Sequence, residues 1–173
     1  MNFEIRELKE PEYPLLENFL YEAIYVPEGF PRPDRGILKT PEMRVYLDRF
    51  GYRSGDYGLA AVMDNEVVGV IWGRIMNDYG HIDDETPSLA LAVHEPFRGH
   101  GIGTALLISF LKLLRADGYR QVSLSVQRSN PAMRLYERIG FETCTNITVE
   151  TAEEVIMRCE LNPAVLAEES PVE

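Results

Sequence analysis

An arginine and three glycines stand close together between an apolar run and a helical pattern. The apolar run covers residues 89–93, and residues 106–114 repeat leucine and phenylalanine at helical spacing. A glycine-rich turn that opens a helix brings together the free N–H groups of the first helical turn and the positive end of the helix dipole. Because glycine has no Cβ, a phosphate can approach this backbone closely. The segment therefore predicts a phosphate or pyrophosphate site made of Arg98, Gly99, His100, Gly101, Ile102, Gly103 and Thr104.

The spacing of these glycines excludes two common phosphate-binding loops. An ATP-type loop needs lysine and then serine or threonine after its last glycine, but Thr104 and Ala105 follow Gly103. The dinucleotide fingerprint GxGxxG also fails, because its third glycine would fall on Thr104 or Leu106. The glycines alone leave another interpretation open, which is a turn that needs them only for its backbone geometry.

A second stretch, residues 121–141, carries the signals of a strand, a capped helix and a further strand. Apolar residues alternate with polar ones over 122–126, as in a half-buried strand. Asn130 is a good N-cap and a proline follows it, at a position that helices accept. Gly140 is typical of the residue that ends a helix. The stretch therefore predicts one short helix between two strands.

Together the two stretches resemble the GNAT superfamily of acetyl-CoA-dependent N-acetyltransferases. The loop (Arg/Gln)-x-x-Gly-x-(Gly/Ala) of that family matches Arg98, Gly101 and Gly103. Its helix motif matches Asn130, Ala132, Leu135, Tyr136, Glu137, Gly140 and Phe141. The resemblance implies an α/β fold, with a mixed, twisted sheet of about six to seven strands flanked by about four helices. It also implies that strands 89–93 and 121–126 splay apart to admit the pantetheine arm of acetyl-CoA.

The resemblance also gives roles to residues of both stretches. The backbone of Leu91, Ala92 and Val93 would polarise the thioester carbonyl, with a β-bulge that frees one N–H group. Asn130 would contact pantetheine as well as cap its helix. Tyr136 would protonate the departing thiolate, since a phenol pKa of ~10 lies near that of a thiol. The alternative for Tyr136 is a buried tyrosine whose hydroxyl bonds locally.

A general base for the amine is harder to place. Some relatives that acetylate protein N-termini carry a glutamate, in the pattern Leu-Glu-Val, where this chain has Ser125. We expect Glu85, just before the strand at 89, to take this role, with Asp84 and His94 as substitutes. A water relay, which needs no dedicated residue, is also open.

The resemblance predicts one reaction and leaves one alternative. The reaction is direct transfer of an acetyl group from acetyl-CoA to a primary amine of a small molecule or protein, within a ternary complex. The alternative is a non-catalytic module that binds acyl-CoA as a sensor or regulator, and Tyr136 favours the enzyme. By the same resemblance, the acceptor site would include Tyr25, Phe30, Arg32 and Arg35. Many relatives dimerise through terminal strands, which allows a homodimer here.

Composition limits the partners and the compartment. The net charge of −11 at pH 7 disfavours nucleic acid and suits a cationic amine. No apolar run reaches the length of a membrane span, and the N-terminal stretch lacks the apolar core of a signal peptide. We therefore expect a cytoplasmic protein with no membrane partner. No His, Cys or Asp spacing predicts a metal site.

The remaining pattern predicts a single domain over residues 1–161, with an acidic tail over 162–173. Further strands are expected at 2–7, 58–63, 67–75, 141–148 and 154–161, and helices from 13 to 24 and from 41 to 50. Residues 25–40 contain three prolines and are expected to be non-helical.

Turn residues and cysteines add two local expectations. Asp64 and Asn65 are typical of a tight hairpin turn. Cys144 and Cys159 lie on the last two expected strands, where they could face each other across a hairpin. A cytosolic compartment favours reduced, buried thiols over a disulfide.

Overall fold

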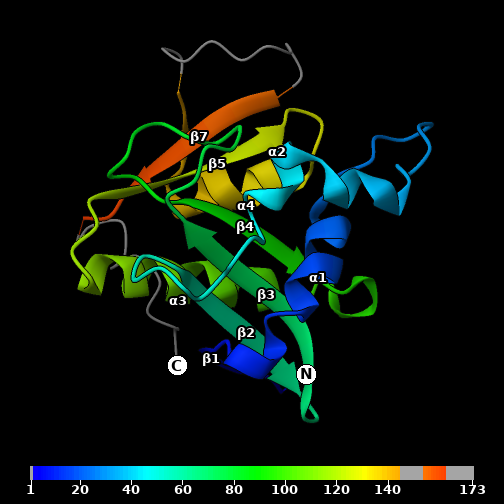
Figure 1. Ribbon diagram of the computed structural model, residues 1–173, viewed down its shortest axis with the longest axis horizontal. Helices are drawn as coiled ribbons and strands as arrows, with labels where there is room; N and C mark the ends of the chain where they lie inside the picture. Colours follow the sequence, from blue (N-terminus) through cyan, green and yellow to red (C-terminus); the bar gives the residue numbers. More distant parts are fainter. Residues whose placement is uncertain (1, 145–153, 163–173) are drawn as a thin grey trace.

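The computed structural model describes residues 2–144 and 154–162, which form one seven-stranded sheet with helices on both faces (Figure 1). The strands lie in the order β1-β2-β3-β4-β5-β7-β6. Their bounds are β1 Glu4–Glu7, β2 Tyr57–Met63, β3 Glu66–Arg74, β4 Ser88–Val93, β5 Gln121–Gln127, β6 Glu142–Thr143 and β7 Glu154–Glu160. Neighbouring strands are antiparallel except β4 and β5, which run parallel. The mixed sheet confirms the predicted fold class.

Two pairs of α-helices cover this sheet, one pair on each face (Figure 1). The helices are α1 Leu15–Ala23 and α2 Pro41–Arg44 on one face, and α3 Ile102–Ala116 and α4 Ala132–Ile139 on the other. Short 3-10 helices occur at Glu10–Glu12, Arg35–Lys39 and Glu95–Phe97. No helix among the described residues is both long and apolar enough to cross a membrane.

Side chains alternate along the central strands and divide the core into two layers. On β3, Ile71 belongs to the layer under α3, together with Phe110. Val70 and Trp72 belong to the layer under α1, together with Phe19. All five side chains are buried, so the sheet is apolar on both faces. The same alternation decides on which face of the sheet each side chain of β4 and β5 lies.

The parallel strands β4 and β5 pair at one register position, Ser88 with Ser123. Next to it, the Ser123 N–H donates to the carbonyl of Pro87 at 3.0 Å. On its other edge β4 stays in register with β3 from Ser88 to Val93, and β5 stays in register with β7 from Gln121 to Gln127. The two strands therefore diverge from each other while each is held by its outer neighbour. This confirms the splay that the resemblance implied.

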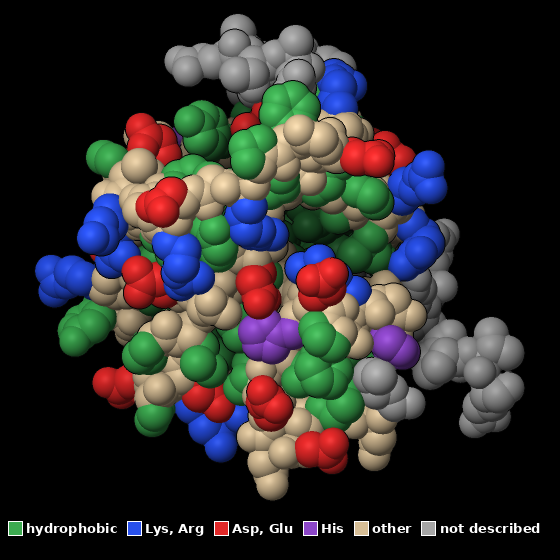
Figure 2. Space-filling view, turned by 90° about the vertical axis from the view of Figure 1, so that its right-hand side faces the viewer, with side chains coloured by type: hydrophobic (Ala, Val, Ile, Leu, Met, Phe, Trp, Pro, Cys, Tyr) green, Lys and Arg blue, Asp and Glu red, His purple; other side chains and the backbone are tan. Residues whose placement is uncertain are grey.

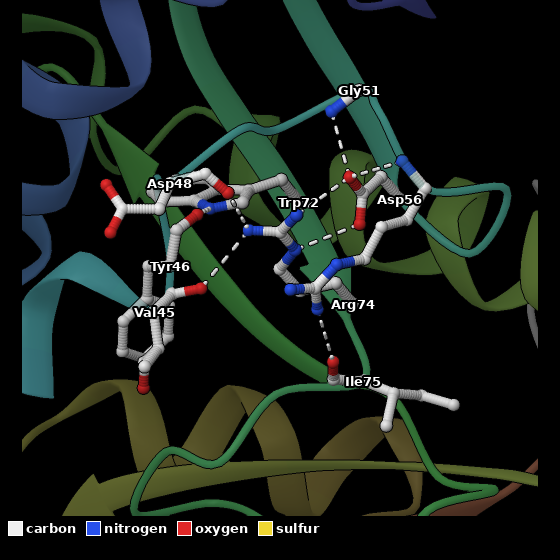
Figure 3. Close-up of polar contacts among 9 residues, drawn as sticks. Val45, Tyr46, Asp48, Gly51, Asp56, Trp72, Arg74 and Ile75 are labelled. Atoms are coloured by element: carbon white, nitrogen blue, oxygen red, sulfur yellow. Dashed lines mark hydrogen bonds and ion pairs between the residues drawn. The ribbon is translucent and has the colours of Figure 1, made fainter.

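A buried ion pair anchors the segment after α2 to the end of β3 (Figure 3). The Nε and Nη2 atoms of Arg74 donate to the two carboxylate oxygens of Asp56, each at 2.9 Å. The two side chains are only 2% and 1% exposed. The Nη1 atom of Arg74 donates to the carbonyls of Val45 and Asp48 at 3.3 and 2.7 Å. The guanidinium thereby connects three parts of the chain.

The same contacts explain why α2 is shorter than predicted. We expected the helix to continue to Phe50, but it ends at Arg44. In a helix that continued to Phe50, the carbonyl of Val45 would accept from the N–H four residues ahead. Arg74 donates to this carbonyl instead, and the chain leaves helical geometry at Arg49, whose φ is 55°. Residues 25–40, expected to be non-helical, contain the 3-10 helix Arg35–Lys39, where the Asp34 carboxylate accepts from the Gly36 N–H.

The strand register corrects the expectation for the two cysteines. Glu142 lies opposite Arg158, and the Cys144 N–H donates to the carbonyl of Ile156. Cys144 is therefore level with Ile156 and does not face Cys159. Both cysteines are free thiols, and Cys159 is buried. Burial raises the pKa of Cys159 to about 11, so this thiol is protonated at neutral pH.

Other local expectations have mixed outcomes. Asp64 and Asn65 form the turn between β2 and β3 with φ values of 49° and 65°, as predicted. The strand expected over 141–148 is limited to Glu142–Thr143 among the residues that are described. Residues 145–148 and the tail from 163 onward lie outside the described residues. The division into a domain and a tail stays a prediction.

The Arg74–Asp56 pair predicts a large effect on stability. Replacing Asp56 by alanine leaves a buried guanidinium without its counter-ion, so the free energy of unfolding should fall by about 3–5 kcal/mol. Chemical denaturation followed by circular dichroism measures this change. Asp48→Ala is a matched control, since its carboxylate forms an exposed pair with Arg44 and should cost less than about 1 kcal/mol. Equal losses for the two variants would contradict a special role for the buried pair.

Candidate active site

A cavity of about 350 Å³ lies between the diverging ends of β4 and β5. Residues of both strands line it, including Leu91 and Ser125. From the α1/α2 face it is bounded by Tyr25 and Tyr46, and from the α3/α4 face by Tyr136, so it extends across the sheet. The side of the molecule that Figure 2 shows is hollowed, with hydrophobic side chains at the bottom and charged side chains around the rim.

The glycine turn, residues 98–104, opens α3 as predicted. Gly99 and Gly101 have φ values of 77° and 83°, which residues with a Cβ rarely adopt. An added Cβ on either glycine would meet nothing within 4 Å, so conformation and not crowding requires glycine here. Gly101 is the N-cap and has no side chain that could bond to the first N–H groups of α3. The turn has the form of an open anion site.

Basic side chains lie at this turn. Arg98 is exposed, and its Nε donates to the carbonyl of Val93 at 2.8 Å. His100 contacts the carbonyl of Phe97 through Nδ1 at 3.2 Å. A second guanidinium reaches the turn from α4, where Arg138 donates to the Thr104 hydroxyl at 3.0 Å. No local pattern in the sequence indicated Arg138, because only the packing of α4 beside α3 brings it there.

The backbone of β4 offers hydrogen-bonding groups to the cavity. The N–H of His94, which follows β4, donates to the carbonyl of Val68 on β3 at 2.8 Å. Because successive peptide groups of a strand point in opposite directions, Ala92 also points to β3, whereas Leu91 and Val93 point toward β5. Since β5 has diverged there, the backbone groups of Leu91 and Val93 face the gap between the strands.

The β-bulge expected in β4 is not found. This strand pairs with β3 in unbroken register over Ser88–Val93, and the irregularity of register lies between Ala61 and Val62 on β2. The edge of β4 is exposed instead because β5 diverges from it. The correction changes the cause of the exposed N–H groups and limits them to Leu91 and Val93, because the Ala92 backbone is bonded to β3.

Tyr136 lies on α4 with its side chain in the cavity wall and only 8% exposed. Its ring packs against Phe141 with the centroids 5.7 Å apart. No hydrogen bond joins its hydroxyl to another described residue, so the alternative of a locally satisfied tyrosine finds no support. Burial raises the pKa of Tyr136 to about 12. The hydroxyl is thus protonated across the neutral range, and proton transfer from it to a thiolate is uphill instead of nearly balanced.

The other predicted contact residues divide into two groups. Asn130 lines the cavity, and its Oδ1 accepts from the Ala132 N–H at 2.9 Å, which caps α4. Tyr25 also lines the cavity, with its hydroxyl on the carbonyl of Ser129 at 3.0 Å. The structure does not place the remaining three in the cavity wall: Phe30 is 70% exposed, and both Arg32 and Arg35 stack on the Tyr21 ring.

None of the base candidates from the sequence lines the cavity. Glu85 is exposed in the loop before β4, and its backbone N–H donates to Asp83. Asp84 is exposed and pairs with His81 at 3.5 Å. His94 lies beyond the end of β4 and contacts the Glu22 carboxylate at 2.7 Å. The assignment of Glu85 stays a prediction that this geometry does not strengthen.

Other polar groups at the cavity were missed by sequence reasoning. Tyr46, Glu42 and Glu154 line it, and Asp78 lies directly behind Tyr46. Asp78 is one of several acidic residues in the loop 77–87, and nothing in the local pattern separates it from the others. The described residues contain no cluster of three or more His, Cys, Asp or Glu arranged to hold a metal ion.

Comparison with known proteins defines the class to which this fold and cavity belong. A model of the acetyltransferase (GNAT) family matches residues 6–141, and the chain belongs to this family. An N-alpha-acetyltransferase of Saccharolobus solfataricus is 38% identical over 99 residues, which span 50% of this chain and 59% of that protein. A mycothiol acetyltransferase of Brachybacterium faecium is 31% identical over 111 residues, which span 64% of this chain and 33% of that protein. The chain thus covers less than two thirds of the length of either relative.

Solved structures share the fold. The PaiA N-acetyltransferase of Thermoplasma acidophilum, crystallised with coenzyme A, superposes with a TM-score of 0.67 over 92% of this chain and 99% of that chain, at 20% identity. The ribosomal-protein-S18-alanine N-acetyltransferase of Escherichia coli superposes with a TM-score of 0.62 over 92% of this chain and 94% of that chain, at 18% identity. At these identities the likeness establishes the fold alone.

The glycine turn predicts a specific loss of coenzyme A binding. Gly101→Asp adds a negative charge where we expect pyrophosphate, and like charges in contact cost several kcal/mol, so binding should weaken at least ~100-fold in calorimetry. Gly118→Asp is the matched control, because Gly118 also has a positive φ, of 93°, with open space around it, but lies beyond the other end of α3. An equal effect of both variants, or no effect of Gly101→Asp, would remove the anion-site assignment.

Proposed function

We propose that this protein transfers an acetyl group from acetyl-CoA to a primary amine, directly and within a ternary complex. The observation that carries the proposal is the cavity that extends across the sheet at the gap between β4 and β5. A thioester placed from the α3/α4 face and an amine placed from the α1/α2 face would meet in this gap. Direct transfer needs this kind of meeting point and no nucleophile from the protein.

The residues at the gap fit a CoA thioester. The N–H groups of the glycine turn, with Arg98 and Arg138, would hold the pyrophosphate. The backbone of Leu91 and Val93 would hold the pantetheine arm and donate to the carbonyl oxygen as it gains negative charge, whereas Ala92, which was also expected to do so, points to β3. Asn130 lies where it could bond to the same arm. The thioester supplies the acetyl group, and these protein groups orient it.

Tyr136 is the residue proposed to assist departure of the thiolate. Because burial raises the pKa of Tyr136 to about 12, its hydroxyl keeps its proton and can donate a hydrogen bond to a developing negative charge. A hydrogen bond that strengthens as the carbon–sulfur bond breaks lowers the barrier without complete proton transfer. The free hydroxyl and its position in the cavity wall support this role.

The acceptor side of the cavity supports an amine as substrate. Glu42 and Glu154 line the cavity together with apolar side chains such as Ile24 and Met43. Carboxylates attract a protonated amine, and the apolar wall suits an acceptor with a hydrocarbon portion. The two relatives described above are named for different acceptors, so the class proposed here is no narrower than a primary amine of a small molecule or protein.

Release of free thiol from acetyl-CoA tests the proposal. Polyamines, aminoglycosides, amino acids and short peptides would be compared, with direct CoA binding measured on the same preparation. Thiol release that depends on one class of amine supports the enzyme. Tight CoA binding without release for any amine would favour the alternative of a non-catalytic acyl-CoA sensor.

Tyr136→Phe should lower kcat by more than ~10-fold but no further than about the lower end of the ~10²–10⁴ range of general acids, because its hydroxyl is a weak acid. The affinity for CoA should stay close to that of the wild type, since the ring and its packing remain. Steady-state kinetics and calorimetry measure the two quantities. A variant with full turnover would reduce Tyr136 to a packing residue.

A further inference from the structure

Tyr46 and Asp78 form a hydrogen-bonded pair in which Tyr46 lines the cavity and Asp78 lies behind it. The Tyr46 hydroxyl donates to Asp78 Oδ2 at 2.7 Å, and the Ser88 hydroxyl donates to Asp78 Oδ1 at 2.8 Å. Asp78 also accepts from the N–H of Gly80. Each oxygen of this half-buried carboxylate is therefore held, and the phenol is aimed at one of them. The two residues are 32 positions apart in the sequence.

The pair lies on the acceptor side of the cavity. Tyr46 lines the cavity and packs with the core layer under α1, whereas Tyr136 packs with the layer under α3. The Ser125 hydroxyl of β5 lies near the Tyr46 hydroxyl and acts to lower the pKa of this phenol. That position is the one at which a glutamate base was missing from the sequence. The hydrogen-bonded phenol and carboxylate therefore lie next to Ser125, the position at which some relatives carry a glutamate base and this chain does not.

We propose that Tyr46, with Asp78 behind it, accepts the proton that the acceptor amine loses. This inference rests on the proposed function, because it assigns the base of that reaction. Tyr46 is the catalytic residue, since it alone of the two lines the cavity. Asp78 acts through Tyr46 and is a positioning residue that receives the phenolic proton.

One series of steps accounts for every bond made or broken and for every proton moved. The amine nitrogen forms a bond to the thioester carbonyl carbon and becomes strongly acidic. Its proton moves to Tyr46 Oη as the phenolic proton moves to Asp78 Oδ2. The carbon–sulfur bond then breaks, and the thiolate leaves with a hydrogen bond from Tyr136 until it takes a proton from solvent. The products are the amide and free thiol, and Asp78 returns its proton to solvent.

The environment of the pair suits a relay. Burial, and then the carboxylates of Asp78 and Glu154, raise the pKa of Tyr46 well above its usual value, so the phenol stays neutral. Burial raises the pKa of Asp78 above 3.8, while the bonds from Tyr46, Ser88 and Gly80 act in the opposite direction. A carboxylate with a raised pKa is a stronger proton acceptor than an ordinary aspartate. Glu154 of β7 and Glu42 of α2 are the other carboxylates that face this side of the cavity.

The pH dependence of kcat with saturating amine tests the relay. In the wild type, kcat should rise with pH as Asp78 ionises, with a midpoint above the usual range of aspartic acid. Tyr46→Phe and Asp78→Asn should each lower kcat by roughly 100-fold, within the usual range for general bases. The kcat that remains in these variants should no longer rise with pH. The KM for acetyl-CoA and the calorimetric affinity for CoA should not change, because the pair lies on the other face.

Ser88→Ala tests the direction in which the pH dependence of kcat shifts while both Tyr46 and Asp78 are kept. Losing the Ser88 bond takes away one group that lowers the pKa of Asp78. The rise of kcat should therefore move to higher pH. Tyr52→Phe and Asp83→Asn are matched controls, because Tyr52 is 78% exposed and Asp83 is exposed in the same loop as Asp78. Thermal melts of all variants identify any that fail to fold.

Three outcomes overturn the proposal in different ways. If the wild type turns over an amine and both Tyr46→Phe and Asp78→Asn keep its rate and profile, the relay is wrong and the proposed function stands. If Glu154→Gln, and not Asp78→Asn, removes the rise with pH, the base is Glu154. If no amine is turned over although CoA binds, the relay and the proposed function fail together.

Discussion

The divergence of β4 from β5 is the constraint on which the rest of the structure depends. A parallel pair normally shares bonds along its length, but here one register position, Ser88 with Ser123, joins the two strands. Each strand is held on its other side, by β3 or by β7, so the gap does not weaken the sheet as a whole. The gap exposes the backbone of Leu91 and Val93 and creates a cavity between the two core layers.

Two different sets of functional groups lie on the two sides of this gap. On the α3/α4 face the glycine turn, two arginines and Tyr136 gather groups that favour anions and a leaving thiolate. On the α1/α2 face Glu42, Glu154 and the pair Tyr46–Asp78 gather groups that favour cations and accept protons. The sheet keeps these sets apart, so that in the proposed reaction the thioester and the amine would meet at the gap from opposite faces.

The buried arginine of β3 is linked to this arrangement through the chain. Arg74 binds the carbonyls of Val45 and Asp48, on either side of Tyr46 in sequence, and its partner Asp56 holds the loop that follows. The indole N–H of Trp72 donates to the carbonyl of Tyr46 at 3.1 Å. Arg74 and Trp72, both on β3, therefore fix the backbone that carries Tyr46, just beyond the end of α2. A longer helix would place this phenol elsewhere.

Features that depend on near neighbours in the chain were predictable from the amino-acid sequence. Alternation located the strands, and the positive φ at Gly99, Gly101 and Gly140 was readable because only glycine adopts it easily. Glycine spacing indicated the turn, and the resemblance to the GNAT family indicated Tyr136. The tertiary structure alone decided the early end of α2, the contact of Arg138 with Thr104 and the pairing of Tyr46 with Asp78. Each of these joins residues far apart in the chain, and local pattern carries no information about which distant donor will reach a given oxygen. For the same reason the loop acids were indistinguishable until packing buried Asp78 and left Glu85 in solvent.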